Sequence, residues 1–348
     1  MKKALLFILI AILIFTFSGC RKTETPSLTV GFLCSSEQVY DKDVNQAVWE
    51  ALTGASVKYE ITAEYAVCTL YDKESVASGI YELYQKGCRM IYTADYKFAT
   101  ALSSLQKSYK ECKFICLDYS LSSISSNSMC IQFAEHEAAF VAAVAAANEL
   151  KTGKIACILG MDLPSSQKYL SGLKSGIEYA NRIYGTSVTL DESEIVFIGS
   201  YNDPSLAYNL AEEMYNNGVK GIFTDGYRSG DGVYAAAINA RKIGLQAYVI
   251  GNRTDNYDKG IYENSDDSVS LVSAAFDYTT AVNYPIDKYL SGGYQGGKLI
   301  VLSCSSDGIA APQTSKNLSA KSVEASMDTV LKIKNGEIIV KDPSSLLD

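Results

Sequence analysis

The feature that most constrains the fold is a repeated alternation of short apolar runs with longer amphipathic segments. Residues 28–34, 89–93 and 114–118 have the length and apolar character of buried strands. The segment 73–87 shows helical periodicity and stops at a glycine. Repeated strand–helix units of this kind favour a parallel sheet with helices on both of its faces.

The second half of the chain repeats this pattern, with strand-like runs at 154–159, 195–198, 221–224 and 247–250. The 348 residues are long for one domain and suit two hydrophobic cores. We therefore predict an α/β fold of two Rossmann-like lobes with parallel sheets, joined by a multi-segment hinge. The predicted boundaries are 28–133 plus 254–303 for the N-terminal lobe, 134–253 plus 304–335 for the C-terminal lobe, and 336–348 for a tail, with crossings near 133–135, 251–255 and 303–308.

The N-terminus has the pattern of an export signal. A basic start is followed by an apolar run over 4–17 and then by Ser18-Gly19-Cys20. The run is short for a membrane span and fits a secretory signal, and small residues before a cysteine are typical of a lipobox. We predict a lipoprotein signal peptide over 1–20, lipidation at Cys20, a polar tether over 21–27, and an extracytoplasmic protein anchored to the cell membrane. The alternatives are an ordinary signal peptide or a membrane anchor, with Cys20 incidental.

Charge and cysteine spacing argue against several kinds of partner. The formal net charge is −8 and no dense Lys/Arg cluster occurs, which disfavours nucleic acid. Several of the eight cysteines after Cys20 lie in apolar strand-like runs, so we expect mostly free thiols. Cys112 and Cys116 lack the second pair or histidine that a zinc site needs. No Gly-x-Gly-x-x-Gly follows the first strand, and we expect neither a metal nor a cofactor.

Polar and aromatic residues recur where the predicted strands end. In open parallel sheets, ligands bind beyond the carboxyl ends of the strands. Each such residue could also be a helix cap, but together they would converge on one cleft. The 25 tyrosines against 11 phenylalanines would suit a cleft that holds a ring. The candidate ligand residues on this ground are Ser35 and Asn45 after the first strand, Asp118 after 115–117, Tyr201 after 195–198, Gly226 and Tyr227 after 222–224, and Asp255 after 248–250.

One segment resembles a known family. Residues 41–50 (DKDVNQAVWE) are similar to the DKSFNQxxWEG segment of the basic membrane lipoproteins, which are substrate-binding lipoproteins of ABC importers related to the purine-nucleoside receptor PnrA. Further stretches agree in order at 132–139 (QFAEHEAA), 160–164 (GMDLP), 199–204 (GSYNDP) and 230–234 (GDGVY), so that the similarity spans roughly 28–310. The resemblance implies two Rossmann-like lobes that close on a nucleoside.

The resemblance also implies roles for particular residues. Asn45 matches the family's base-binding asparagine, and Tyr201 matches an aromatic that stacks on the base. Asp255 aligns best with an aspartate that grips the ribose hydroxyls, and Gly226-Tyr227 falls at a Gly-Gly turn.

Three positions depart from the family pattern. Val44 stands where the family has a stacking aromatic, Ser35 where it has an aspartate, and Phe276 where it has a lysine. Loss of a stacking ring and of charged partners weakens the expectation of a purine nucleoside. A modified nucleoside or another small polar molecule stays open as the ligand.

These observations favour a solute-binding protein of an ABC importer that captures a nucleoside-like ligand and docks on a permease. A sensory or signalling lipoprotein of the same fold is an alternative. A nucleoside-processing hydrolase is disfavoured, because no Gly-x-Ser-x-Gly elbow occurs and His136 is the single histidine. We interpret His136 as a capping or surface residue, and we predict that the chain is not an enzyme.

Overall fold

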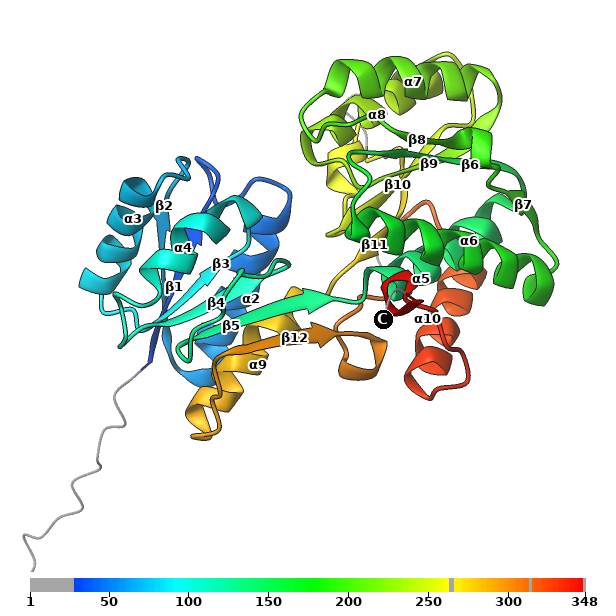
Figure 1. Cartoon of the computed structure of the whole chain (residues 1–348). Coiled ribbons are helices and arrows are strands. Elements are labelled where there is room, and N and C mark those ends of the chain that lie inside the picture. The colour runs from blue at the N-terminus through cyan, green and yellow to red at the C-terminus, as the bar shows by residue number, and fades with distance from the viewer. Residues whose placement is uncertain (1–27, 263–265, 313–314, 347–348) are drawn as a thin grey trace, which may run out of the picture.

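The computed structural model describes residues 28–262, 266–312 and 315–346. They form two α/β lobes placed side by side (Figure 1). The N-terminal lobe is mainly blue and cyan, with orange segments from late in the chain, and the C-terminal lobe is mainly green and yellow, with a red helix near the C-terminus. The predicted signal peptide, Cys20 and tether lie outside the described residues. Across the described ranges, no helix has both the length and the apolar character needed to cross a bilayer.

The N-terminal lobe is built on a sheet of six parallel strands in the order β12-β5-β4-β3-β1-β2. Its central strands are almost entirely buried, as the apolar runs predicted. The strands are β1 (Thr29–Cys34), β2 (Thr62–Val67), β3 (Met90–Thr93), β4 (Lys113–Leu117), β5 (Ser128–Phe133) and β12 (Lys298–Leu302). The helices that accompany them are α2 (Val44–Tyr59), α3 (Lys73–Gln85), α4 (Ala99–Leu105) and α9 (Tyr278–Leu290), with the 3-10 turn η1 (Tyr96–Phe98).

The C-terminal lobe has a second parallel sheet in the order β11-β10-β9-β6-β7, with β8 also paired to β6. Its strands are β6 (Thr152–Leu159), β7 (Ser187–Thr189), β8 (Ile195–Phe197), β9 (Val219–Thr224), β10 (Tyr248–Arg253) and β11 (Ser270–Ala275). Its helices are α5 (Glu135–Leu150), α6 (Pro164–Tyr184), α7 (Pro204–Asn216), α8 (Tyr227–Lys242) and α10 (Ala320–Lys334); the short 3-10 turns are η2 (Glu192–Glu194), η3 (Asp258–Gly260), η4 (Cys304–Ser306) and η5 (Pro343–Leu346). The predicted fold class of two parallel-sheet lobes is confirmed.

The alanine-rich helix α5 is the central helix of the C-terminal lobe. Almost all of its side chains are buried, between α6, α10 and strand β11. The close approach of α6 depends on small residues, since a Cβ atom added at Gly172 would lie 2.1 Å from the carbonyl oxygen of His136 on α5. This tight contact makes α5 and α6 one packed unit.

Three chain segments cross between the lobes. They join β5 to α5, β11 to α9 and β12 to η4. Backbone hydrogen bonds link neighbouring crossings, for example from the Ala134 N–H to the Leu302 oxygen (2.8 Å) and from the Asp277 N–H to the Gly308 oxygen (2.9 Å). The rings of Phe133 and Phe276 stack within the hinge at 4.2 Å between centroids. The lobes are therefore joined by a short, hydrogen-bonded hinge with an aromatic core.

The structure corrects one predicted boundary and one predicted crossing. We assigned 254–303 to the N-terminal lobe and a crossing to 251–255. Instead, β10 runs to Arg253 and pairs with β11, with Arg253 opposite Ala275. The polar sequence after 253 is a loop of the C-terminal lobe, and the chain crosses only after β11. Part of the predicted tail also has structure, because the 3-10 turn over Pro343–Leu346 packs on α6.

The eight cysteines between Cys34 and Cys304 are buried and unpaired. This agrees with the prediction of free thiols. Burial raises the pKa of most of them, for example that of Cys34 to about 11. They act as small apolar side chains of the two cores.

Candidate functional site

A cavity of about 250 Å³ lies between the lobes at the carboxyl ends of their strands. This is slightly below the ~300–1,000 Å³ of pockets for drug-sized ligands. Two of its lining residues belong to the N-terminal lobe, Tyr96 and Asp118. The others come from the C-terminal lobe: Met161, Leu163, Ser165, Tyr169, Tyr201, Asp225, Tyr227, Asn252 and Arg253.

An ion pair crosses the cavity from one lobe to the other. The Arg253 Nε atom lies 2.5 Å from Oδ2 of Asp118, and both side chains are about nine-tenths buried. At this distance the two charged groups are in direct contact. Burial raises the pKa of Asp118 while Arg253 opposes that rise. The pair therefore ties the lobes together at a substantial desolvation cost.

Both members of this ion pair have a left-handed backbone. The φ angles of Asp118 and Arg253 are 65° and 66°, and that of Tyr227 is 41°. Such angles are uncommon for residues with a side chain, and they cluster at functional sites. Asp118 is fixed there by its N–H, which donates to the Ile131 oxygen at 2.7 Å. The backbone at the strand ends is bent so that these side chains reach the cavity.

Tyrosine rings form the apolar part of the cavity. Tyr227 lies edge-on to Tyr201 of its own lobe (5.2 Å between centroids) and to Tyr96 of the other lobe (6.1 Å). The guanidinium of Arg253 lies 4.8 Å from the centre of the Tyr227 ring, an attractive cation–π contact. Tyr227 is thus the common neighbour of the aromatic and charged groups of both lobes.

On the C-terminal side of the cavity, a buried carboxylate stabilises the loops that line it. Asp225 accepts a hydrogen bond from the Gly160 N–H at 2.8 Å and a short one from the Ser166 hydroxyl. Burial raises its pKa, and these two donors oppose the rise. Gly160 must lack a side chain, because a Cβ atom there would lie 2.2 Å from the Tyr201 ring. Asp225 therefore fixes the loop against which Tyr201 rests.

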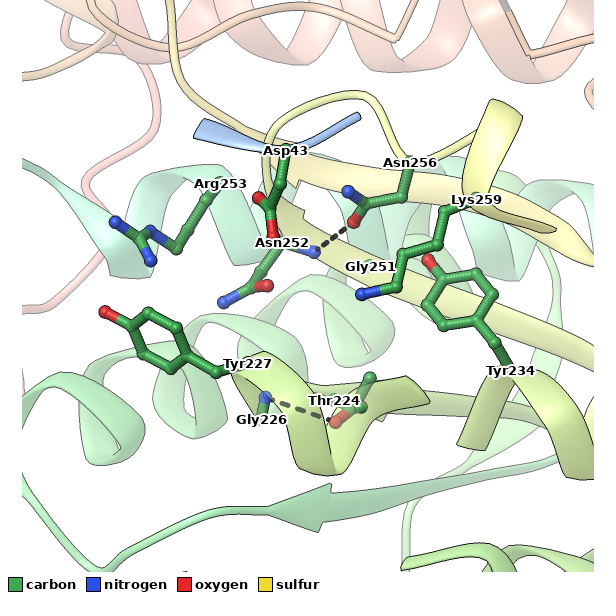
Figure 2. Close-up of a pocket in the computed structure, with 11 residues that line it drawn as sticks. Asp43, Thr224, Gly226, Tyr227, Tyr234, Gly251, Asn252, Arg253, Asn256 and Lys259 are labelled. Atoms are coloured by element: carbon green, nitrogen blue, oxygen red, sulfur yellow. Dashed lines mark hydrogen bonds between the residues drawn. The ribbon is translucent and has the colours of Figure 1, made fainter. Parts of the chain in front are cut away.

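A smaller pocket lies behind Tyr227 and Arg253, and Figure 2 shows its lining. Asp43, at the start of α2, comes from the N-terminal lobe, while Asn252 and Lys259 come from the C-terminal lobe. In Figure 2 the guanidinium of Arg253 lies above the hydroxyl end of Tyr227. Arg253 and Tyr227 thus separate this pocket from the main cavity.

Several of the predicted ligand residues meet in these two spaces. Asp118, Tyr201 and Tyr227 line the main cavity, and Gly226 lines the smaller pocket. Gly226 also caps α8, with its N–H donating to the Thr224 hydroxyl at 3.3 Å. Residues that follow strands in both lobes therefore do lie together, as their positions after the strand ends predicted.

Other predicted residues are engaged elsewhere. Asn45 and Ser35 hydrogen-bond to each other, and the Asn45 amide also donates to Asp41 at 2.7 Å. Neither lines the main cavity. Val44 is buried in the core of the N-terminal lobe, so the position of the family's stacking aromatic faces inward here.

Asp255 and Phe276 line a different cavity of about 560 Å³, beside the hinge. Phe276 stacks on Phe133 in the hinge core, so its ring stabilises the crossing rather than the main cavity. The Asp255 carboxylate accepts from the Tyr257 N–H at 3.0 Å. The residue that enters the cleft from the end of β10 is Arg253, two positions before the expected aspartate.

Sequence reasoning missed Tyr96 as a cavity residue, and within the candidate loop 252–255 it singled out Asp255 rather than Asn252 and Arg253. Asn252 and Arg253 are the last two residues of β10, whereas the prediction ended this strand at 250. Tyr96 lies on the short turn η1 after β3. No pattern of apolar residues in the sequence indicates that its side chain faces the cavity.

His136 is buried rather than at the surface, and burial lowers its pKa. It begins α5 next to Glu135, away from the cavity lining. Within the described ranges, no cluster of three histidine, cysteine or acidic side chains could hold a metal ion.

Comparisons with known proteins give the chain a family. The family model for PnrA-like ABC transporter substrate-binding proteins, Bmp, matches residues 28–344. A protein of Lactococcus lactis described as "ABC transporter nucleoside-binding protein BmpA" is 27% identical over 84% of this chain and 82% of its own length. Basic membrane protein A1 of Borrelia garinii is 28% identical over 98% of this chain and 96% of its own.

Solved structures agree on the fold. A solute-binding protein of an ABC transporter from Conexibacter woesei has a TM-score of 0.70 at 14% identity and covers 91% of this chain and 99% of its own. A similar protein from Aeropyrum pernix has a TM-score of 0.65 at 19% identity, covering 91% of this chain and 94% of its own. With two parallel-sheet lobes, a cavity between them and a family match over nearly the whole described length, this chain belongs to the Bmp family of PnrA-like ABC transporter substrate-binding proteins.

Proposed function

We propose that the protein captures a nucleoside-like small polar molecule in the cavity between its lobes and presents it to an ABC permease. The observation that carries this proposal is the joint lining of one cavity by tyrosine rings and charged side chains from both lobes. Tyrosine offers a stacking face for a base together with a hydroxyl group. The nucleoside-binding relative in Lactococcus lactis supports this class of ligand.

The hinge supplies the motion that such a carrier needs. A ligand held by Asp118 of one lobe and by Tyr201 of the other gains contacts only when the lobes are close. Closure is then a two-state equilibrium that the ligand biases by contacting both sides. The closed form is the one that a permease would recognise.

The proposed location is outside the cytoplasmic membrane, with the protein held there by a lipid on Cys20. The support is the basic start, the apolar run and the Ser18-Gly19-Cys20 sequence, together with the extracytoplasmic nature of substrate-binding proteins of this family. Detergent partitioning of the expressed full chain tests it. The wild type should enter the detergent phase and Cys20→Ala should not, whereas equal partitioning would contradict lipidation at this residue.

A thermal-shift panel tests the ligand class. The purified protein is mixed with purine and pyrimidine nucleosides, sugars and amino acids. A ligand at 100 times its Kd stabilises the fold by about 2.7 kcal/mol, which is a clear rise in Tm. We expect nucleosides to raise Tm and the Tyr201→Ala variant to lose about half of that rise. A response confined to sugars or amino acids would contradict the nucleoside proposal.

The same samples test for enzymatic activity. A carrier returns its ligand unchanged, so chromatography of the bound fraction should recover intact nucleoside. Free base and ribose that accumulate with time would indicate a hydrolase instead.

A further inference from the structure

Glu135 is a buried carboxyl group that ligand capture, as described above, does not use. It is the first residue of α5 and comes directly after the crossing that leaves β5 at Phe133. The residue is only 7% exposed. One of its two carboxylate oxygens, Oε2, has no hydrogen-bond donor among the described residues. A buried carboxylate with an unpartnered oxygen is costly when it is charged, so this position favours the protonated form.

The groups that face Glu135 come from α6, from the C-terminal segment and from the other lobe. On α6, the Ser165 hydroxyl donates to Oε1 at 3.3 Å, and the Lys168 ammonium lies 3.7 Å from Oε2. This ammonium is shared, because it also lies 3.4 Å from Oδ2 of Asp342. From the N-terminal lobe, the charge of Asp118 acts on Glu135. A single shared lysine is therefore the cation that opposes these carboxylates.

Two further titratable side chains lie close to this carboxyl group. Tyr169 of α6 is buried within the field of Glu135, and burial raises the pKa of its hydroxyl well above the ordinary value. His136 is the next residue of α5, and burial lowers its pKa. Both side chains are therefore neutral at pH 7, and neither supplies a positive charge that would keep Glu135 ionised.

The position of the lobes affects how tightly Glu135 holds a proton. Burial raises the pKa of Glu135 to about 7, while Lys168 opposes the rise and Asp118 adds to it. Ser165, which donates to Glu135, lines the cavity between the lobes. Opening of the lobes moves Asp118 away and admits water to this wall of the cavity, so the pKa falls towards its ordinary value. The closed form therefore binds the proton more tightly than the open form.

We propose that Glu135 is a proton switch at the hinge, and that closure of the lobes on a ligand takes up one proton from the solvent at this carboxylate. The inference rests on the proposed function, since it assigns a regulation to the same closure.

The direction of the pH dependence follows from the raised pKa of the closed form. Below the pKa of the open form, Glu135 is protonated in both forms, and closure proceeds without a buried charge. As pH rises towards about 7, the open form loses its proton first, so closure must either take up a proton or bury a carboxylate. Ligand affinity is therefore greatest in acidic solution and falls as pH rises through this window.

Calorimetric titration of the full chain with guanosine measures both effects. Titrations at pH 7 in buffers of different ionisation enthalpy count the protons exchanged, and the wild type should take up about half a proton. Its affinity should be about threefold to tenfold higher at pH 5.5 than at pH 8.5, which corresponds to a pKa difference of up to about one unit. Glu135→Gln resembles the protonated carboxyl group, so it should lose the uptake and keep high affinity at both pH values.

Two control variants separate Glu135 from its neighbours. Glu178→Gln removes an exposed carboxyl group of α6 and should keep the wild-type proton uptake. His136→Gln removes the adjacent imidazole and should also keep it, because burial already holds that ring neutral at pH 7. Uptake that disappears in His136→Gln and persists in Glu135→Gln would overturn the assignment to Glu135.

A measurement without ligand makes the test independent of the nucleoside. Small-angle X-ray scattering of the ligand-free protein should give a smaller mean radius of gyration at pH 5.5 than at pH 8.5, because protonation of Glu135 favours closure. In Glu135→Gln the radius should be the same at both pH values.

Failure of the proton switch and failure of the proposed function give different results. Guanosine binding without proton uptake, or with the wild-type uptake in Glu135→Gln, would overturn the switch and leave the carrier function standing. No binding of guanosine, with a radius of gyration that depends on pH in the wild type alone, would support the switch and contradict the nucleoside part of the proposed function. A radius that is independent of pH in the wild type, without guanosine binding, would overturn both.

Discussion

The two lobes contribute very unequally to the cavity. The N-terminal lobe supplies Tyr96 and Asp118, whereas the C-terminal lobe supplies the remaining lining residues, including Tyr201 and Arg253. The C-terminal lobe also contains the tight contact of α5 with α6, and the crossing from β5 leads directly into α5. This difference indicates that the C-terminal lobe is a rigid platform that receives the ligand, and that the N-terminal lobe closes on it through few contacts.

The largest loss of stability is expected where a substitution adds a side-chain atom between the packed helices of the C-terminal lobe. In Gly172→Ala the new Cβ atom would lie 2.1 Å from the His136 oxygen and 2.8 Å from the Ala139 Cβ atom. Backbone on α5 would have to shift, so we expect a loss of about 3 kcal/mol in the free energy of unfolding. Urea denaturation measures it. A loss below about 0.5 kcal/mol would show that the two helices are not tightly packed.

Charge at the start of α5 should make the stability of the platform depend on pH. Burial raises the pKa of Glu135 from 4.5 to about 7, with Lys168 opposing the rise. The folded state then binds more protons than the unfolded state between about pH 4.5 and 7, so stability falls as pH rises through this window. We expect Glu135→Gln to be more stable than wild type by about 2 kcal/mol at pH 8 and nearly equal at pH 4.

Melting curves at several pH values measure this difference. Glu178→Gln, on the exposed face of α6, is the matched control and should change neither value. A Glu135→Gln difference that is the same at pH 4 and pH 8 would contradict an ionisation effect.

Ligand affinity should separate the two walls of the cavity. Tyr201→Ala removes a ring of the platform and should weaken nucleoside binding by about 1.5 kcal/mol, as expected for a lost stacking partner. Tyr96→Ala removes a ring that is 46% exposed on the closing lobe and should cost less than about 1 kcal/mol. Calorimetric titration measures the nucleoside affinity of both variants. A larger loss of affinity in Tyr96→Ala than in Tyr201→Ala would contradict the view that the C-terminal lobe provides most of the binding contacts.

The smallest expected effect is on the closing lobe, far from the cavity. Gly54 lies inside α2 with open space around its missing side chain. Gly54→Ala should stabilise the protein by about 0.5–1 kcal/mol, because alanine loses less backbone entropy in a helix. Nucleoside affinity should be unchanged. A change in affinity would show that α2 is coupled to the cavity.

The parts of the site that the sequence predicted are those governed by strand ends. Asp118 directly follows a predicted strand and Tyr227 comes three residues after the end of another. The carboxyl ends of parallel strands share one edge of a sheet, so both residues are expected near the cleft. The fold class follows from the alternation of short apolar runs, which form strands, with amphipathic segments, which form helices.

The missed parts depend on pairing between distant segments. The end of β10 at Arg253 is set by its partner β11, which periodicity within 247–255 does not reveal. Phe276 was expected at the ligand because a family alignment places it there, but its stacking on Phe133 is a tertiary contact of the hinge.

A crystal structure of the protein with guanosine tests the central claim most directly. The account predicts the nucleoside between the lobes, beside Tyr201 and Tyr227 and in contact with Asp118 and Arg253. Nucleoside bound instead in the hinge cavity beside Asp255 and Phe276, with the Asp118–Arg253 pair unchanged, would contradict it.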